Sequence, residues 1–271
     1  MNKYTFDCKK TLDLKDRNLM QLFLHQCYIH DGYSYDLHLI TENLKKIPQF
    51  FLCYNNDEIV GCFSLFPEDK KTLTVYALVN PLHRKKGIFS SLLSLLIKTI
   101  KEAKTTYKTL EFHIPNIKID YFEPALTILK KNDYFLSHQE YLLKYLLSSY
   151  ELSKIERQLK VSTIPDVDFN EKNDEFSLYI NERYVGGCFI YTPNCPENPY
   201  ATIFQYGIIK SLRGKGYGKA GLYAILSKLN ASGYFKVLLH VSGKNKAAHN
   251  LYTSCGFLTD SSLLIYQKNI I

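Results

Sequence analysis

The pattern of hydrophobic and polar positions occurs twice along the chain. Residues 51–63 and 176–189 each read as two apolar strands joined by a polar turn, Asn55-Asn56-Asp57 in the first copy and Asn181-Glu182 in the second. Because a third strand, a basic turn, a helix and a histidine-bearing strand follow in the same order each time, we interpret the chain as a duplicated module.

The later elements of each copy repeat as closely as the hairpins. The third strands lie at 73–79 and 201–209, and the helices after the basic turns carry apolar residues at helical spacing, namely Leu92, Leu93, Leu95, Leu96 in one and Leu222, Ile225, Leu226, Leu229 in the other. Each copy then has a strand with a histidine, His113 or His240, a further helix, and an apolar strand that ends near Leu146 or Gln267. Mixed strands and helices in this order predict an α/β fold in which each module is a twisted mixed sheet flanked by helices.

We place the modules at 1–147 and 148–271, with a joining helix over 148–160. The first copy has room for two opening helices, at 14–27 and 39–47, whereas the lead before the second hairpin is shorter. The opening helices of the second module are therefore expected to be shortened or replaced by the joining helix.

Composition describes a globular protein, with 46% hydrophobic and 22% charged residues among 271. No apolar run follows Lys3, and no segment has the apolar length of a membrane span, so we expect neither a secretory signal nor a membrane location. The seven cysteines are odd in number and form no Cys-x-x-Cys pair. A reducing cytoplasm without a metal site is the simplest setting for them.

The formal charge of +8 is compatible with nucleic acid, but the lysines are scattered along the chain. The densest basic cluster, 83–86, coincides with the first glycine turn, so a small ligand with several phosphates explains it without a polymer. We expect no nucleic-acid partner. A nucleic-acid binder would instead show steeply salt-dependent binding.

The second basic turn, 213–218, carries the most specific chemistry. Its glycines at 214, 216 and 218 lack the Cβ atoms that would keep an anion away from the backbone. The helix that follows presents unpaired N–H groups at the same point, and Arg213, Lys215 and Lys219 add positive charge. The pattern indicates a pyrophosphate cradle, although alone it also fits an ordinary glycine-rich turn.

This architecture and the Arg-x-x-Gly-x-Gly turn resemble the GNAT superfamily of acetyl-CoA-dependent N-acetyltransferases, and the two modules look like its tandem members. The segment 242–257 is similar to the family's Asn-x-x-Ala-x-x-x-Tyr-x-x-x-Gly-Phe motif. The resemblance covers nearly the whole chain and implies acetyl-CoA as cofactor. By position it implies a cofactor site made by Tyr206, Gly207, Ile208, Arg213, Gly214, Lys215, Gly216, Tyr217, Gly218, Lys219 and Asn245.

Two candidate catalytic residues follow from the same resemblance. Tyr252 lies seven residues after Asn245, two helical turns on, and would sit beside the cofactor sulfur as an acid. His240 occupies a position where some family members carry a basic glutamate, and imidazole can accept a proton near neutral pH. A hydrogen-bonded core role for His240, and a water relay in its place, both remain open.

The first half departs from these motifs. Lys130 aligns opposite Tyr252, the Asn-x-x-Ala signature is missing near Phe122 and Glu123, and Phe89 replaces the last glycine of the turn. The turn still offers a second candidate cofactor site, made by Val79, Arg84, Lys85, Lys86, Gly87, Ile88 and Phe89. We expect this half to be non-catalytic, or to bind cofactor without reacting it, and to help form the acceptor site.

The function these features favour is an acyl-CoA-dependent N-acyltransferase that moves acetyl to a primary amine by direct attack in the C-terminal module. The alternative is a non-catalytic acyl-CoA-binding or regulatory protein. The acceptor would be a small-molecule or peptide amine, held by 14–47, 136–141 and 191–200, and the protein a monomer or homodimer. The proline-rich stretch 193–199 either borders that pocket or is a plain hairpin connection.

Overall fold

The computed structural model describes residues 3–35, 37, 44, 46–116, 122–147, 168–172, 175–180 and 182–270. The chain forms two compact units, one of residues 1–138 with 263–271 and one of residues 139–262. The joining helix expected over 148–160 and most of the helix expected over 39–47 lie outside the described residues. None of the described helices is long and apolar enough to cross a membrane.

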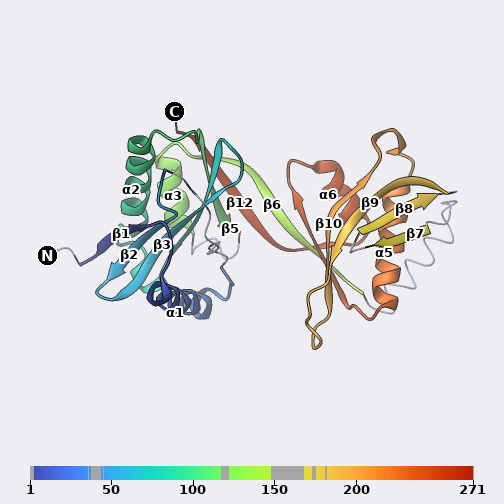
Figure 1. The fold of residues 1–271 in the computed structure, drawn as a ribbon, viewed down its shortest axis with the longest axis horizontal. Coiled ribbons are helices and arrows are strands. Elements are labelled where there is room, and N and C mark those ends of the chain that lie inside the picture. Colours follow the sequence, from blue (N-terminus) through green and yellow to red (C-terminus); the bar gives the residue numbers. More distant parts are fainter. Residues whose placement is uncertain are drawn as a thin grey trace. The chain divides into compact units, whose positions relative to one another are not determined.

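The first unit is a mixed sheet with helices on both faces (Figure 1). Its strands are β1 (Thr5–Lys9), β2 (Phe50–Asn55), β3 (Glu58–Pro67), β4 (Thr72–Val79), β5 (Thr109–Pro115) and the end of β12 (Leu258–Asn269), hydrogen-bonded in that order. Its helices are α1 (Leu14–Asp31), α2 (Ile88–Ala103) and α3 (Glu123–Lys131), with a short 3-10 helix, η1 (Pro81–His83). Only the pairing of β4 with β5 is parallel among these neighbours.

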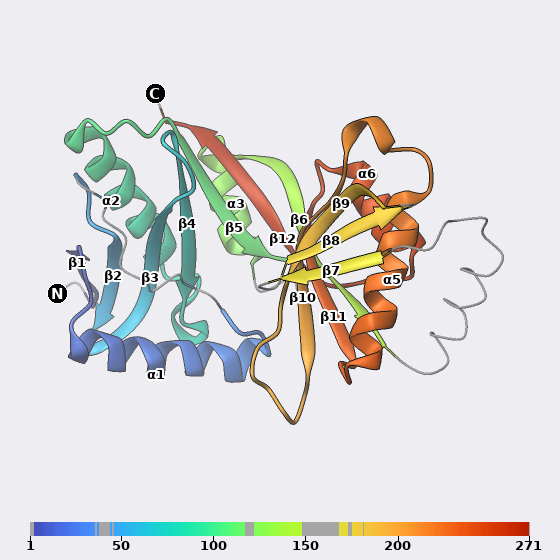
Figure 2. The same cartoon turned by 45° about the vertical axis from the view of Figure 1, so that its right-hand side comes forward.

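Strand alternation in β3 explains why helices pack on both faces of the first unit. Phe63 joins the buried cluster under α2, whereas Cys62 joins a second cluster with Met20 and Phe23 of α1. Figure 2 shows α1 and α2 beside the strands of this unit. Both faces of this sheet are therefore covered.

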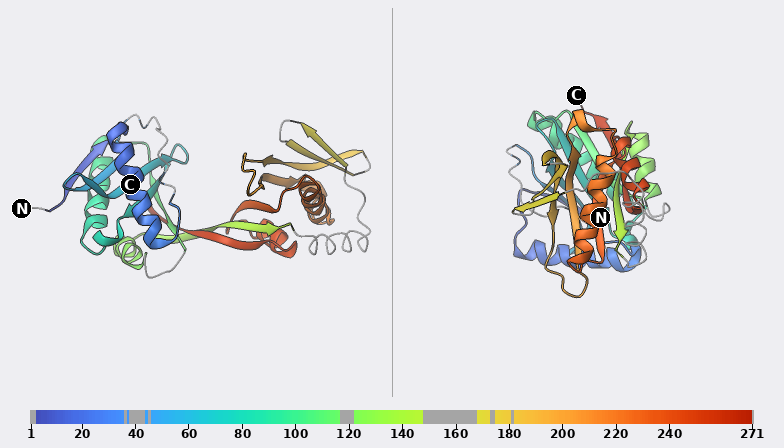
Figure 3. Two further views of the ribbon diagram at one scale, coloured as in Figure 1. Left: turned by 90° about the horizontal axis from the view of Figure 1, so that it is seen from below. Right: turned by 90° about the vertical axis from the view of Figure 1, so that its right-hand side faces the viewer.

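The second unit repeats the plan with β7 (Asp168–Lys172), β8 (Glu175–Ile180), β9 (Arg183–Tyr191), β10 (Tyr200–Ile208), β11 (Lys236–Ser242) and β6 (Phe135–Leu146), in that order. Its described helices are α5 (Tyr217–Ala231) and α6 (Lys246–Ser254), with a 3-10 helix, η3 (Lys210–Leu212). α5 packs on one face of the sheet (Figure 3), and its apolar side enters a single cluster with β8 to β11. We call this the inner face and the opposite one the outer face. In the first unit the inner face is the one under α2.

The closing strands are exchanged between the two halves of the sequence. Residues 140–146 of β6 pair with β11, and residues 263–269 of β12 pair with β5, both antiparallel. The compact units therefore differ from the halves drawn at residue 147. The repeat predicts a closing strand in each copy, but it does not specify the partner because β5 and β11 offer equivalent apolar edges.

Candidate functional site

The turn after β10 has the backbone geometry of an anion cradle. Gly214 and Gly216 have φ angles of 79° and 83°, in the left-handed region that favours glycine. A Cβ atom built on either residue would meet nothing within 4 Å, so both glycines face open space. The base of the turn is fixed by Arg213, whose Nε donates to the Ile208 carbonyl at 2.9 Å.

Consecutive amides of this turn are available to a ligand. The N–H groups of residues 214–218 donate to no residue that the structure describes, while the next amide, of Lys219, bonds to Gly216 O at 3.0 Å. Gly216 is the N-cap of α5 and makes no side-chain cap hydrogen bond. Free amides at the positive end of a helix dipole form an anion-binding site. The helix starts at Tyr217, directly after Gly216.

Two residues of the predicted cradle have local packing partners. A Cβ atom on Gly218 would lie 3.3 Å from the Leu251 side chain, so this glycine permits close packing of α5 on α6. The Lys219 ammonium lies 5.7 Å from the centroid of the Tyr223 ring. The open glycines of the cradle are therefore 214 and 216.

The parallel strands β10 and β11 separate beside the cradle. They are paired from Tyr200 with Lys236 to Ile203 with Leu239, and the ladder ends there. A bulge follows in β10, where Gln205 has a φ angle of 52°. Past the bulge, Tyr206 points inward and its hydroxyl donates to Gly218 O at 2.6 Å. The gap between the strands leaves backbone groups of 206–208 at a free strand edge.

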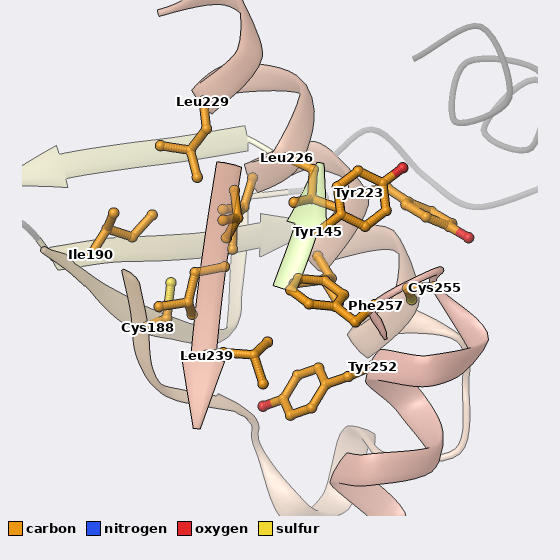
Figure 4. Close-up of a cluster of buried hydrophobic side chains, with 14 of the residues drawn as sticks. Tyr145, Cys188, Ile190, Tyr223, Leu226, Leu229, Leu239, Tyr252, Cys255 and Phe257 are labelled. Carbon is orange, nitrogen blue, oxygen red and sulfur yellow. The ribbon is translucent and has the colours of Figure 1, made fainter. Parts of the chain in front are cut away.

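Tyr252 approaches this gap from the inner face. Figure 4 shows its ring at the edge of the buried cluster that contains Leu239 and Phe257, and only 6% of the residue is exposed. Burial raises the pKa of Tyr252 to about 12, so the phenol is protonated at neutral pH. Its hydroxyl bonds to none of the described residues. The Asn245 side chain accepts from the Ala248 N–H at 3.2 Å and caps α6, which gives it a structural role in addition to any ligand contact.

His240 flanks the gap from the other face. It directly follows Leu239, the last paired residue, and is exposed on the outer side of β11. Partial burial lowers the pKa of His240 below its usual 6.5, and the charge of Glu140 opposes this shift. The structure therefore places Tyr252 and His240 on opposite faces of one gap.

The first unit has a matching cradle with one added contact. Lys85 and Gly87 have φ angles of 60° and 81°, and the N–H groups of 85–89 donate to no residue within the described ranges. Arg84 Nε donates to the Val79 carbonyl at 3.0 Å, as Arg213 does to Ile208. Here, however, the guanidinium also forms a bidentate pair with Asp31, which is fully buried at the end of α1.

A cleft of about 80 Å³ opens between this first cradle and α3. Its walls are mainly apolar and include Phe89, Ile114, Phe122 and Ile128. On the outer side of the same strands, the rings of Tyr76 and His113 make an edge contact at 5.4 Å between centroids. The first unit therefore has an open inner cleft, while its outer mouth is occupied by two rings.

Backbone pairing shows which residues of the two copies correspond, and it corrects the alignment of Lys130 with Tyr252. The Phe257 N–H bonds to Tyr252 O, and the Tyr134 N–H bonds to Leu129 O in the same way, so Leu129 and not Lys130 is the counterpart of Tyr252. Gly61 pairs with Val79 as Gly186 pairs with Ile208, so Gly186 is the counterpart of Gly61 in the second unit. The first unit thus has a buried leucine where the second has a phenol.

Comparison with known proteins decides the family. A model of the acetyltransferase (GNAT) family matches residues 17–119 and, separately, residues 140–257. The chain belongs to this family. The family resemblance and the fold expected from the sequence, two tandem mixed α/β modules, are both confirmed.

Relatives of this GNAT protein support the same assignment. The uncharacterized N-acetyltransferase YycN of Bacillus subtilis (strain 168) is 38% identical over 85 residues, which are 30% of this chain and 53% of that protein. The chain thus matches about half the length of this curated relative. A GCN5-related N-acetyltransferase from Sphaerobacter thermophilus has a TM-score of 0.68 at 13% identity, covering 100% of this chain and 96% of that one. A tandem GNAT protein from the clavulanic acid biosynthesis pathway has a TM-score of 0.65 at 12% identity, covering 99% of both.

Three residues of the site escaped the sequence reasoning. Gln205 is one extra residue in β10 relative to β4. A comparison of the lengths of the two third strands could have found it. Phe204 stands across the gap from His240, and its importance depends on exposure, which the pattern does not report. Asp31 ends an ordinary amphipathic helix, and no local signal distinguishes it from a surface carboxylate.

Proposed function

We propose that this GNAT protein transfers an acetyl group from acetyl-CoA to a primary amine, and that the second unit performs the transfer. The observation that carries the proposal is the gap between β10 and β11. It begins beside free amides, has a protonated phenol on its inner face, and has an exposed imidazole on its outer face. The N-acetyltransferase family supplies the general reaction.

The residues present fit the cofactor of the family. Amides 214–218, with Arg213 and Lys215 beside them, would hold the pyrophosphate. The free edge of Tyr206, Gly207 and Ile208 would pair with the amides of the pantetheine arm as an added strand does. When bound, acetyl-CoA supplies an acetyl group activated as a thioester.

The side chains then divide the proton chemistry. An acceptor that arrives as an ammonium first loses one proton to solvent, because only the neutral amine has a lone pair. His240, neutral at pH 7, then accepts a proton from the amine nitrogen directly or through one water as that nitrogen attacks the carbonyl carbon. The new C–N bond forms and the C–S bond breaks. Tyr252 donates a hydrogen bond to the departing sulfur, whose proton comes from water. His240 returns its proton to solvent before the next turnover.

The first unit is assigned a non-reacting role. Its cradle of Arg84, Lys85, Lys86, Gly87 and neighbouring amides would bind a second CoA, with the chain from Val79 to Phe89 along the cleft. Leu129 gives that site no hydroxyl for the sulfur, and Tyr76 with His113 fills the mouth through which an amine would enter. These features support binding without transfer.

Matched substitutions in the two cradles test this division. Gly216→Asp and Gly87→Asp each place a carboxylate at an N-cap with a similar φ angle and open space for the side chain, so their folding costs should be alike. Free-thiol release from acetyl-CoA with a panel of primary amines should be lost in Gly216→Asp and persist in Gly87→Asp. Loss in Gly87→Asp alone would move catalysis to the first unit. Acetyl-CoA binding without thiol release from any amine would favour the non-catalytic alternative.

A further inference from the structure

We propose that the outer mouth of the second unit is an aromatic platform for the acceptor, so that the acceptor is a primary amine carried on a flat aromatic body. The platform consists of Phe189, Tyr191 and Phe204. This inference rests on the proposed transfer in the second unit and specifies the substrate class of that site.

The platform borders the gap directly. Phe204 follows Ile203, the last residue paired with β11, just as His240 follows Leu239 on the neighbouring strand. Both side chains alternate to the outer face, so they flank the opening from its two sides. Phe189 is the cross-strand partner of Phe204, so both phenyl rings project from the same face of neighbouring strands.

These rings are much more exposed than the apolar side chains on the inner face of the same strands. Phe189, Phe204 and Tyr191 are 45%, 43% and 57% exposed. The first unit has a serine, Ser64, where the second has Phe189, and that serine is fully buried. A group of exposed aromatic side chains beside a candidate base marks a contact surface.

Charged side chains near His240 determine which charge a ligand can carry there. Glu140 lies on the outer face of β6 and acts on the titration of His240. The nearby Lys144 is neutralised by an ion pair with Asp260, with 2.7 Å between nitrogen and oxygen. The charge of Glu140 favours a cation beside His240, and the ring faces would add a cation–π attraction to an ammonium.

Together these features describe the acceptor. Its aromatic body would lie on Phe189 and Phe204, and its amine, on a short flexible chain, would reach past Phe204 to His240 and the gap. An aliphatic amine would meet the same carboxylate but would lose the stacking contacts, which are worth roughly tenfold in affinity.

The test uses the full chain, acetyl-CoA, and two probes, 2-phenylethylamine and n-butylamine, with thiol release as the readout. The value of kcat/KM for 2-phenylethylamine should exceed that for n-butylamine by about tenfold or more. Phe204→Ala should remove most of this preference by raising KM for the aromatic amine, and Phe204→Leu should give an intermediate result because it keeps apolar bulk without a ring. Tyr184→Ala is the matched control, since Tyr184 is equally exposed on β9 but lies away from the gap.

The outcomes separate the two proposals. Equal use of both amines, or no effect of Phe204→Ala, overturns the platform while the transfer stands. Binding of 2-phenylethylamine by calorimetry in the presence of CoA, lost in Phe204→Ala but without thiol release, supports the platform and overturns the transfer. If 2-phenylethylamine does not bind and no thiol is released, both proposals are overturned.

Discussion

Replacing Tyr252 by phenylalanine tests how the leaving sulfur is stabilised. Burial raises the pKa of this phenol to about 12, whereas a thiol has a reference pKa near 8.5. Full proton transfer to the thiolate would therefore be uphill by about 3.5 pKa units, or roughly 5 kcal/mol. Tyr252 is expected to act as a hydrogen-bond donor to a charged sulfur, an interaction worth about 1.5–3 kcal/mol.

The expected result of Tyr252→Phe is a drop in kcat of about ten- to a hundredfold with little change in the KM for acetyl-CoA. Because the hydroxyl makes no hydrogen bond within the described part of the chain, the free energy of unfolding should change by less than about 0.5 kcal/mol. Thiol release under saturating substrates measures the first quantity, and urea unfolding the second. A kcat within twofold of the parent would refute the reasoning.

A second tyrosine-to-phenylalanine substitution, in the first unit, is the control. Tyr134 is the counterpart of Phe257, and its hydroxyl is buried without a hydrogen-bond partner among the described residues. Tyr134→Phe should leave kcat unchanged and raise the free energy of unfolding, by as much as about 1–3 kcal/mol, because an unsatisfied polar group is removed. A fall in stability would show that the hydroxyl has a partner.

Two further substitutions address the cradle of the first unit and the base of the second. Asp31→Asn leaves the Arg84 guanidinium without its buried carboxylate and should lower the free energy of unfolding by about 3–5 kcal/mol. Urea unfolding measures this change, and an unchanged midpoint of the urea transition would contradict the pairing. In the pH profile of kcat, protonation of His240 should produce an acid limb below pH 6.5, because burial lowers its pKa and the neutral base persists into mildly acidic solution. His240→Gln should abolish that limb, and a limb that survives the substitution would point to a different base.

Local pattern predicts most of the elements that build the site. Apolar alternation locates β2 to β4 and β8 to β10, and the glycines at 214 and 216 mark a turn whose positive φ angles only glycine adopts readily. The stretch 193–199 connects β9 to β10, as expected from its place between two apolar strands. Residues close together in the sequence determine these features, so they can be predicted from the sequence.

Contacts between distant segments are less predictable. β6 and β12 have the same apolar character, and a competition between two nearly equivalent edges decides which strand each one joins. The sequence pairs Lys130 with Tyr252 because two aromatic residues stand side by side at 134 and 135, and matching Phe135 to Phe257 shifts the alignment by one residue; the backbone gives that position to Tyr134. Phe204 looks like any apolar strand residue, and only its exposure at the end of the ladder sets it apart.

Amide hydrogen exchange with and without CoA measures most directly whether the main chain of the second unit grips the cofactor. The N–H groups of 214–218 make no hydrogen bond to described residues in the free protein, so they should exchange fast and slow markedly when a pyrophosphate accepts from them. Residues 85–89 report on the first cradle in the same experiment. Slowed exchange at 214–218 at saturating CoA is the predicted result. Two results would contradict the account: unchanged exchange at 214–218 while CoA is bound to the protein, and no binding of CoA at millimolar concentration.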